Sequence, residues 1–268
     1  MRFLNLLCSI VCLLGIVVPG LEAGVLIVSD YESAPEQKGV STTKAYVDRD
    51  RMRVEIGDKD ADRVFIFRQD QERFWLIDNK SKTYTEITKQ DLHKMKQQLD
   101  GAMALMQEKM KNLPPEQRKM MEQITKGKIP ATLPEAPKIV YKKVASGEKI
   151  NRWICDKYEG HATEKDKEEI WTTDWQQAGI TEADLKVIQG MGEFFAEFVR
   201  NLPFLSKIGS KEWEKEHGYS GFPIQTIRYA GTQVQYKMTI KDIRRQDFTA
   251  ALFDLPSGLQ KKATPATP

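Results

Sequence analysis

The side chains that could carry chemistry are few and far apart in this chain. The histidines are His93, His161 and His217, and their spacing matches no metal-ligand pattern. Cys155 and His161 could form a nucleophile pair, but six residues of extended chain separate them by about 20 Å. The local signature of a thiol enzyme is missing. So are the nucleophile elbow, the phosphate loop and the Gly-rich dinucleotide turn. The sequence therefore predicts a protein that is not an enzyme, with no catalytic residue and no cofactor.

One acidic segment could suggest a bound cation. Asp58, Asp60 and Asp62 alternate along a short turn, as ligands of a calcium loop do. The turn has no Gly at its bend and no Glu at the distance that closes such a loop. We therefore interpret it as a solvated turn and predict no metal site.

The N-terminus has the pattern of a secretory signal peptide. Arg2 precedes an apolar run over residues 3–18, Pro19 and Gly20 interrupt it, and Ala23 offers a cleavage site. Residues 1–23 are therefore predicted to be removed from a periplasmic or secreted protein, with an uncleaved anchor as the alternative. Membrane association is then peripheral at most. Cleavage leaves Cys155 as the lone cysteine, which is typical of a buried small hydrophobe.

Charge and length indicate which partners and which domain organisation to expect. The formal net charge is +3 over 268 residues, with both signs mixed along the chain, so nucleic acid is not an expected partner. Residues 24–260 fit one large β domain, and residues 261–268 are expected to be a disordered tail.

Most of this domain has the alternation or the β-rich composition of strands. In the segment RMRVEIG, Met52, Val54 and Ile56 are predicted to face the core, while Arg51, Arg53 and Glu55 face water. The full set of predicted strands is residues 25–31, 40–48, 51–57, 63–67, 73–78, 83–87, 139–145, 152–158, 168–173, 222–230 and 232–243.

Two of these strands are apolar on both faces. In RVFIF, Val64 and Ile66 point one way and Phe65 and Phe67 the other, and the following RFWLID carries Trp75 among apolar neighbours. Such strands need cover on both sides. One face should therefore meet the core, and the other a helix, a ligand or a partner.

A Met-rich helical insertion at residues 89–127 interrupts the strands. Its apolar residues recur in steps of three and four, which places them on one face of a helix that ends at Pro114. A short second helix is predicted after Pro115. Six of the chain's ten Met lie here, and Met suits either an adaptable ligand surface or a gap-filling core. Both interpretations remain open: a plug that closes the sheet, or a helix that also touches a ligand.

The predicted apolar binding residues are Phe65, Phe67, Trp75, Met95, Met103, Met106 and Met110.

The second half repeats the plan of strands followed by a helix. Thr181 and Asp184 resemble a capping pair, and an apolar stripe that includes Phe195 runs to residue 199. Phe194 and Phe198 add apolar side chains on its flanks, more than a helix facing solvent needs. Residues 207–221 are expected to form a polar surface loop. The predicted fold class is mainly β (α+β), with a large curved antiparallel sheet, or unclosed half-barrel, and helices on its concave face.

Several segments in order resemble a family of secreted bacterial proteins known as a domain of unknown function and related to the LolA/LolB-like lipoprotein carriers. They are RMRVE, FWLIDNKSKTYTEI, NLPPEQRKMMEQ, WICDKYEG, GFPIQTIRY and FDLPSGLQKK. The resemblance implies a half-barrel with helices in its concave face and a Gram-negative envelope setting. In the carriers this cavity holds acyl chains. The Met-rich insertion departs from the carriers, and no motif maps onto their lipoprotein-handling residues.

Two functions follow as hypotheses. The first is a non-enzymatic envelope protein that binds an apolar ligand, either a lipid acyl chain or a lipidated protein, between sheet and helices. The alternative is a protein-interaction or assembly module with a filled core, which binds through an exposed sheet edge.

Overall fold

The computed structural model describes residues 23–33, 39–57, 61–111, 113–114, 117, 139–161, 163, 166–196 and 209–263. Most of the predicted signal peptide, most of the short helix after Pro115 and residues 264–268 of the tail lie outside these ranges. No helix in the described ranges is long and apolar enough to cross a membrane.

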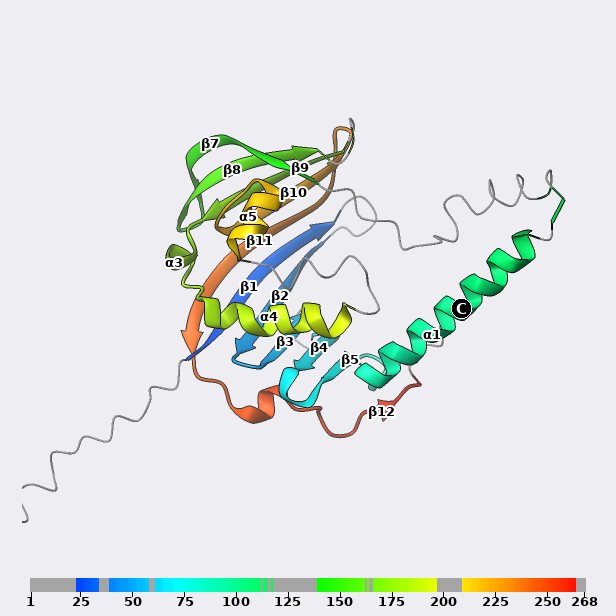
Figure 1. The fold of residues 1–268 in the computed structure, drawn as a ribbon. Helices are drawn as coiled ribbons and strands as arrows, with labels where there is room; N and C mark the ends of the chain where they lie inside the picture. Colours follow the sequence, from blue (N-terminus) through cyan, green and yellow to red (C-terminus); the bar gives the residue numbers. More distant parts are fainter. Residues whose placement is uncertain are drawn as a thin grey trace, which may run out of the picture.

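A single 12-stranded sheet organises the fold (Figure 1). The first block contains β1 (Gly24–Ser33), β2 (Val40–Asp48), β3 (Arg51–Ile56), β4 (Arg63–Arg68), β5 (Arg73–Asp78) and β6 (Thr83–Thr88). The second contains β7 (Tyr141–Ile150), β8 (Trp153–His161), β9 (Asp166–Thr173), β10 (Phe222–Ala230) and β11 (Gln233–Gln246), followed by β12 (Gln260–Lys261). All the strands predicted from the sequence are present.

The strand order joins the two blocks at the middle of the sheet. It runs β12-β6-β5-β4-β3-β2-β1-β11-β10-β9-β8-β7. Neighbouring strands are antiparallel, except that β12 runs parallel to β6. Lys262 N–H donates to the Tyr84 carbonyl, so the segment predicted to be a tail is tied to β6 at its start.

Register shifts bend the sheet. They occur in the β1–β11 pair at Val28/Ser29 and in β10 at Pro223/Gln225 and Arg228/Tyr229. Such bulges bend a strand and increase its twist. The sheet is therefore strongly curved without closing, which confirms the predicted half-barrel.

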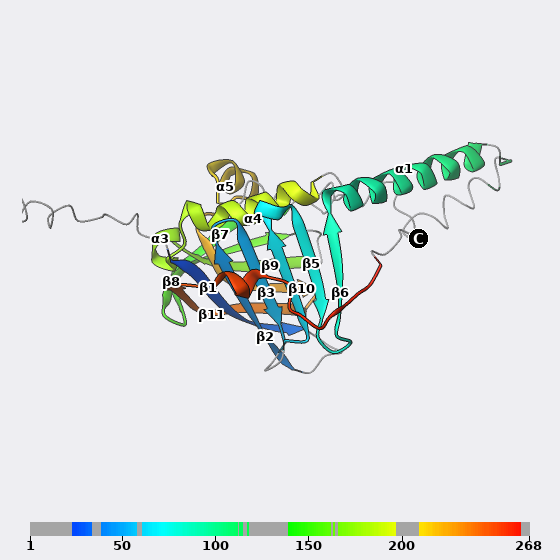
Figure 2. The same ribbon diagram turned by 90° about the horizontal axis from the view of Figure 1, so that it is seen from below.

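The helices differ in how they meet this sheet. The short α3 (Trp175–Ala178) leads into α4 (Glu182–Phe195), which lies across the concave side, and α5 (Lys211–His217) lies on the same side (Figure 2). The segment with α5 had been predicted to be a loop. The Met-rich segment forms α1 (Lys89–Lys111), which starts at β6 and extends past the sheet edge.

The capping pair predicted at the start of α4 is present. Asp184 accepts hydrogen bonds from the backbone N–H and the hydroxyl of Thr181, each 2.7 Å long. Arg245 of β11 donates to both oxygens of Asp184 and to the Gly179 carbonyl. This guanidinium fixes the first turn of α4 to the centre of the sheet.

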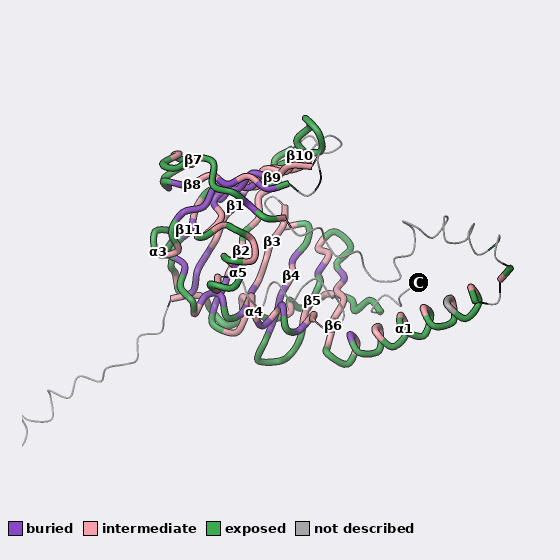
Figure 3. The backbone as a smooth tube through the Cα atoms, turned by 45° about the horizontal axis from the view of Figure 1, so that its top comes forward, coloured by how far each residue is buried: buried purple, intermediate pink, exposed green. Residues whose placement is uncertain are grey.

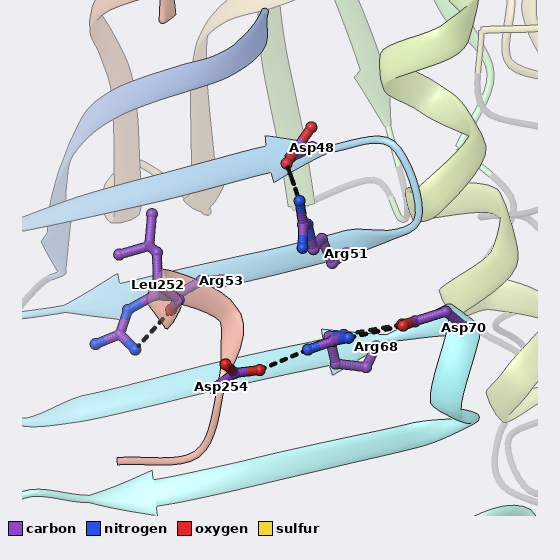
Figure 4. A network of polar contacts seen from close by, with 7 residues as sticks. All are labelled: Asp48, Arg51, Arg53, Arg68, Asp70, Leu252 and Asp254. Atoms are coloured by element: carbon purple, nitrogen blue, oxygen red, sulfur yellow. Dashed lines mark hydrogen bonds and ion pairs between the residues drawn. The ribbon is translucent and has the colours of Figure 1, made fainter. Parts of the chain in front are cut away.

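The convex face of the first block is covered by the chain's C-terminal segment. In the 3-10 helix η4 (Ala250–Phe253), Phe253 is fully buried against β4 and β5. Arg68 on β4 donates to Asp254 at 2.7 Å, and Arg53 on β3 donates to the Leu252 carbonyl at 3.3 Å (Figure 4). The prediction that Arg53 simply faces water is therefore wrong, because a distant segment packs over that face.

Candidate functional site

The register of β1 to β6 arranges the side chains of the concave face in three rows. Successive rows are two residues apart along each strand, about 7 Å. The inner row is Val25, Val47, Met52, Phe67, Phe74 and Ile87. The middle row is Ile27, Ala45, Val54, Phe65, Leu76 and Thr85. The rim row is Ser29, Thr43, Ile56, Arg63, Asp78 and Thr83.

Helix α4 packs on the inner row. Val187 and Phe194 of the helix form one buried cluster with Val47, Met52 and Phe67. The rings of Phe67 and Phe194 are 5.5 Å apart. The centre of the inner row is therefore ordinary filled core.

A chain of aromatic rings leads out of this core toward the open end of the face. Phe195 lies edge-on to Phe194 at 4.9 Å and to Phe74 at 5.2 Å. Phe74 in turn lies 6.1 Å from Phe65 in the middle row. Phe65, Phe74 and Phe195 are only half-buried, and Leu76 beside Phe65 is 37% exposed. The apolar surface thus continues beyond the part that α4 fills.

Helix α1 joins the same surface through its first turns. Leu92 is 2% exposed and belongs to the cluster of Phe67 and Phe194. Beyond it, the stripe of side chains facing the same way stays half-buried while most of the rest of the helix is exposed (Figure 3). That stripe is Met95, Leu99, Met103, Met106 and Met110.

The structure places the predicted binding residues in three positions. Phe65 and Phe67 are neighbours on the concave face, in the middle and inner rows. The four predicted methionines share one face of α1, which continues from Leu92 away from the sheet. Trp75 lies on the opposite face of the sheet, buried with Phe253, and its indole N–H donates to Glu86 at 2.9 Å.

Two further residues of the surface had a signal in the sequence. Phe195 belongs to the predicted apolar stripe, and Phe194 adds to the flank of that stripe, which is more apolar than a helix facing solvent needs. Their contacts with Phe67 and Phe74 depend on how α4 crosses the strands, which the periodicity of the helix does not specify.

The candidate catalytic side chains remain apart. Cys155 is 1% exposed, and burial raises the pKa of its thiol to about 11, so it is neutral and shielded. His161 is exposed at the far end of the same strand. His217 stacks on Trp213, and His93 contacts Gln97. Among the described residues, no group of three or more potential ligands could hold a metal ion.

Two cavities in the described part include none of the predicted binding residues, and most of the residues that line them are polar or charged. One, of ≈ 340 Å³, lies between the ends of β8 and β9 and helices α3 and α5, with Asp174, Trp175 and Glu214 in its wall. The other, of ≈ 520 Å³, lies beside the first turn of α4 and is lined by Arg49, Gln69 and Lys186 among others. Neither cavity includes a residue of the three rows.

Solved structures with a similar course of the chain share little sequence with it. An uncharacterized conserved protein from Thermus thermophilus is 8% identical, with 96% of this chain and 99% of that protein covered and a TM-score of 0.44. MucB in the MucA/MucB complex of Pseudomonas aeruginosa is 8% identical, with 90% and 58% covered and a TM-score of 0.39. A LolA superfamily protein from Nitrosomonas europaea is 8% identical, with 88% and 91% covered and a TM-score of 0.27.

Sequence comparison identifies the family. No curated protein matches the chain. A family model does match, over residues 88–259, which is more than half of the sequence, and its description is Domain of unknown function (DUF4412). The chain therefore belongs to the DUF4412 family.

Proposed function

We propose that this protein binds an apolar chain, from a lipid or a lipidated protein, on the concave face between the sheet and its helices. The protein acts as a non-enzymatic carrier or receptor in the cell envelope. The ligand lies on the middle row, beside Phe65 and Leu76, and continues toward the Met95 end of the α1 stripe. Trp75 takes no part in this binding, because it is packed on the convex face.

The observation that supports the proposal is the half-exposed middle row. The centre of the inner row is buried under α4, yet the next row outward is also apolar, with Val54, Phe65 and Leu76 side by side. Covering such a surface stabilises a complex by about 0.8 kcal/mol for each buried methylene group of the ligand. A flexible apolar chain can follow this row, and the unbranched methionines of α1 can adapt to it.

The alternative, a sheet edge that recruits a protein strand, has less support. One edge of the sheet is β7, whose pairing with β8 is interrupted twice, between Lys143 and Ala145 and between Ala145 and Glu148. Exposed lysines accompany these irregularities. Bulges and lysines are the features that keep an edge from pairing with another strand.

The first test is direct. Protein purified without detergent is extracted with organic solvent, and the extract is analysed by mass spectrometry for lipid. The same protein is then titrated with phenylnaphthylamine, a neutral apolar fluorescent probe. We expect co-purified lipid, or saturable probe binding once the lipid is removed. A protein that carries no lipid and takes up no probe would favour the assembly module.

A pair of variants locates the site. Leu76→Glu puts a charge into the middle row at a side chain that is 37% exposed, so the fold tolerates it and probe binding is lost. Val144→Glu adds the same charge on β7 at a side chain that is 51% exposed and outside the rows, so binding is retained. Equal binding by both variants would place the ligand elsewhere.

A further inference from the structure

The rim row carries a cation at the end of the apolar surface. Arg63 lies two residues before Phe65 on β4 and therefore faces the same side, about 7 Å further along the strand. Exposure rises in this direction, from 1% at Phe67 through a half-buried Phe65 to an exposed Arg63. The surface is thus apolar at one end and carries an arginine, opposite Asp78, at the other.

This arginine differs from the others on β3 to β5. Four arginines on the convex face each form an ion pair with a carboxylate, at 2.7 to 3.5 Å: Arg51, Arg53, Arg68 and Arg73. Arg63 has no ion pair or side-chain hydrogen bond within the part of the chain that the structure describes. Its guanidinium is therefore available to a ligand.

The nearby carboxylates are engaged with other groups. Asp78 lies opposite Arg63 on β5, but it accepts a hydrogen bond from Ser81 N–H at 2.9 Å. The same bonds from Ser81 lower the pKa of Asp78. Asp62 forms an ion pair with Lys80 at 2.8 Å. Among the residues that the structure describes, Arg63 is therefore a charge at the rim that forms no ion pair; Asp58 and Asp60 of the preceding turn lie outside them.

We propose that the ligand is an anionic amphiphile, whose carboxylate or phosphate head is bound by Arg63 while its chain lies over Phe65 and Leu76 toward Phe195. This inference rests on the proposed function, and it adds the ligand class and the direction of binding. A guanidinium suits this head because its planar donors match the oxygens of a carboxylate or a phosphate in pairs. The opposite orientation would leave the cation unpaired and the head over aromatic rings.

Calorimetric titration with four ligands of equal chain length tests the proposal. They are dodecanoate, dodecyl phosphate, dodecanol and dodecyltrimethylammonium, each kept below its micelle concentration at neutral pH. We expect at least one of the two anions to bind about tenfold more tightly than dodecanol, since a hydrogen bond to a charged group is worth about that factor. The cation should bind more weakly than dodecanol. The tighter anion indicates whether the natural head is a fatty carboxylate or a phosphate.

Substitution of the arginine provides the second arm. Arg63→Gln should remove the preference for the anion and leave dodecanol binding unchanged. Lys44→Gln removes the same charge from an exposed position on the opposite face of β2 and should keep the preference. If Arg63→Gln keeps the preference, or if neither anion exceeds dodecanol, the role of Arg63 is wrong although the apolar site stands. If none of the four ligands binds, the proposed function falls as well.

Discussion

Phe67 and Trp75 show which properties of a single residue can be predicted from the sequence and which cannot. The alternation in RVFIF correctly separates Val64 and Ile66 from Phe65 and Phe67, because successive side chains of a strand face opposite sides. It does not indicate which segment will cover each face. Trp75 meets Phe253 from the far end of the chain, a contact between residues that share no local pattern. The sequence pattern alone therefore does not show that Trp75 is packed against Phe253 on the convex face.

Arg63 shows the same limit for charges. Its alternation with Phe65 could be read from the sequence, but its lack of an ion pair could not. That property depends on Asp78 and Asp62 finding other partners, which requires the turn geometry around Ser81 and Lys80.

The buried thiol gives a prediction at this scale. Native protein should react with a thiol reagent far more slowly than protein in denaturant, because Cys155 is 1% exposed and its pKa is raised to about 11 by burial. The folded pKa lies above the ordinary value of 9.0, so folding favours the neutral thiol. This contribution to stability is complete below pH 9.0 and is lost as the pH rises toward 11.

Two substitutions check the assignment. Cys155→Ala should cost about 1 kcal/mol in urea unfolding, whereas Cys155→Ser buries a hydroxyl and should cost more. Rapid labelling of the native protein would contradict the burial.

At the scale of elements, the helix with the longer apolar stripe, α1, is not the one that covers the sheet. Both helices have an apolar stripe, and the stripe of α1 is the longer one. The sheet is nevertheless covered by α4, because Arg245 and the capping pair fix the start of that helix over the centre of the sheet. The sequence therefore predicted the existence and the faces of both helices, but not which of them lies across the strands.

Arg245 of β11, which binds the first turn of α4, should contribute much more to the free energy of unfolding than its neighbour Arg244. Arg245→Ala removes hydrogen bonds to a carboxylate whose side chain is only 11% exposed, and we expect a loss of about 1.5–3 kcal/mol in unfolding free energy. Arg244→Ala is the matched control. Its side chain is 59% exposed and its contact with Asp242 is 3.7 Å long, so the loss should be about 0–1 kcal/mol. Equal losses would mean that α4 does not depend on this anchor.

The two ends of α1 should respond differently to a charge. Met106→Glu places a carboxylate on the part of the helix that extends past the sheet, and we expect little change in melting temperature together with weaker binding of an apolar probe. Leu92→Glu places it in the core cluster at a side chain that is 2% exposed, where an unpaired charge should destabilise the domain by several kcal/mol. A large loss of stability in Met106→Glu would instead identify the Met stripe as core.

At the scale of the molecule, the last strand and η4 complete a core that belongs to the first half of the chain. The segment with Phe253 and Asp254 crosses β3 to β6 and ends in β12 beside β6. The segment belongs to the sequence FDLPSGLQKK near the end of the chain. The structure makes it the cover that the second apolar face of β4 and β5 requires.

This cover can be measured by replacing its central ring. Phe253→Ala should cost about 3–5 kcal/mol in chemical unfolding, because Phe253 is fully buried. Asp254→Asn weakens a contact whose carboxylate is 59% exposed, and should cost about 0–1 kcal/mol. If the two variants were equally stable, the segment would be an appendage and not part of the core.

The pairing of β1 with β11 also sets the order in which the molecule can form. Val25 lies opposite Arg245, so the central ladder joins residues that are far apart in the sequence. Contacts of such long sequence separation slow folding, since the loop between them must be closed before they form. During synthesis β1 can pair with β2 early, but its pairing with β11 has to wait for almost the whole chain to emerge. A chain with this strand order cannot complete its sheet until its last hairpin, β10 and β11, has been synthesised, so it remains partly unfolded until then.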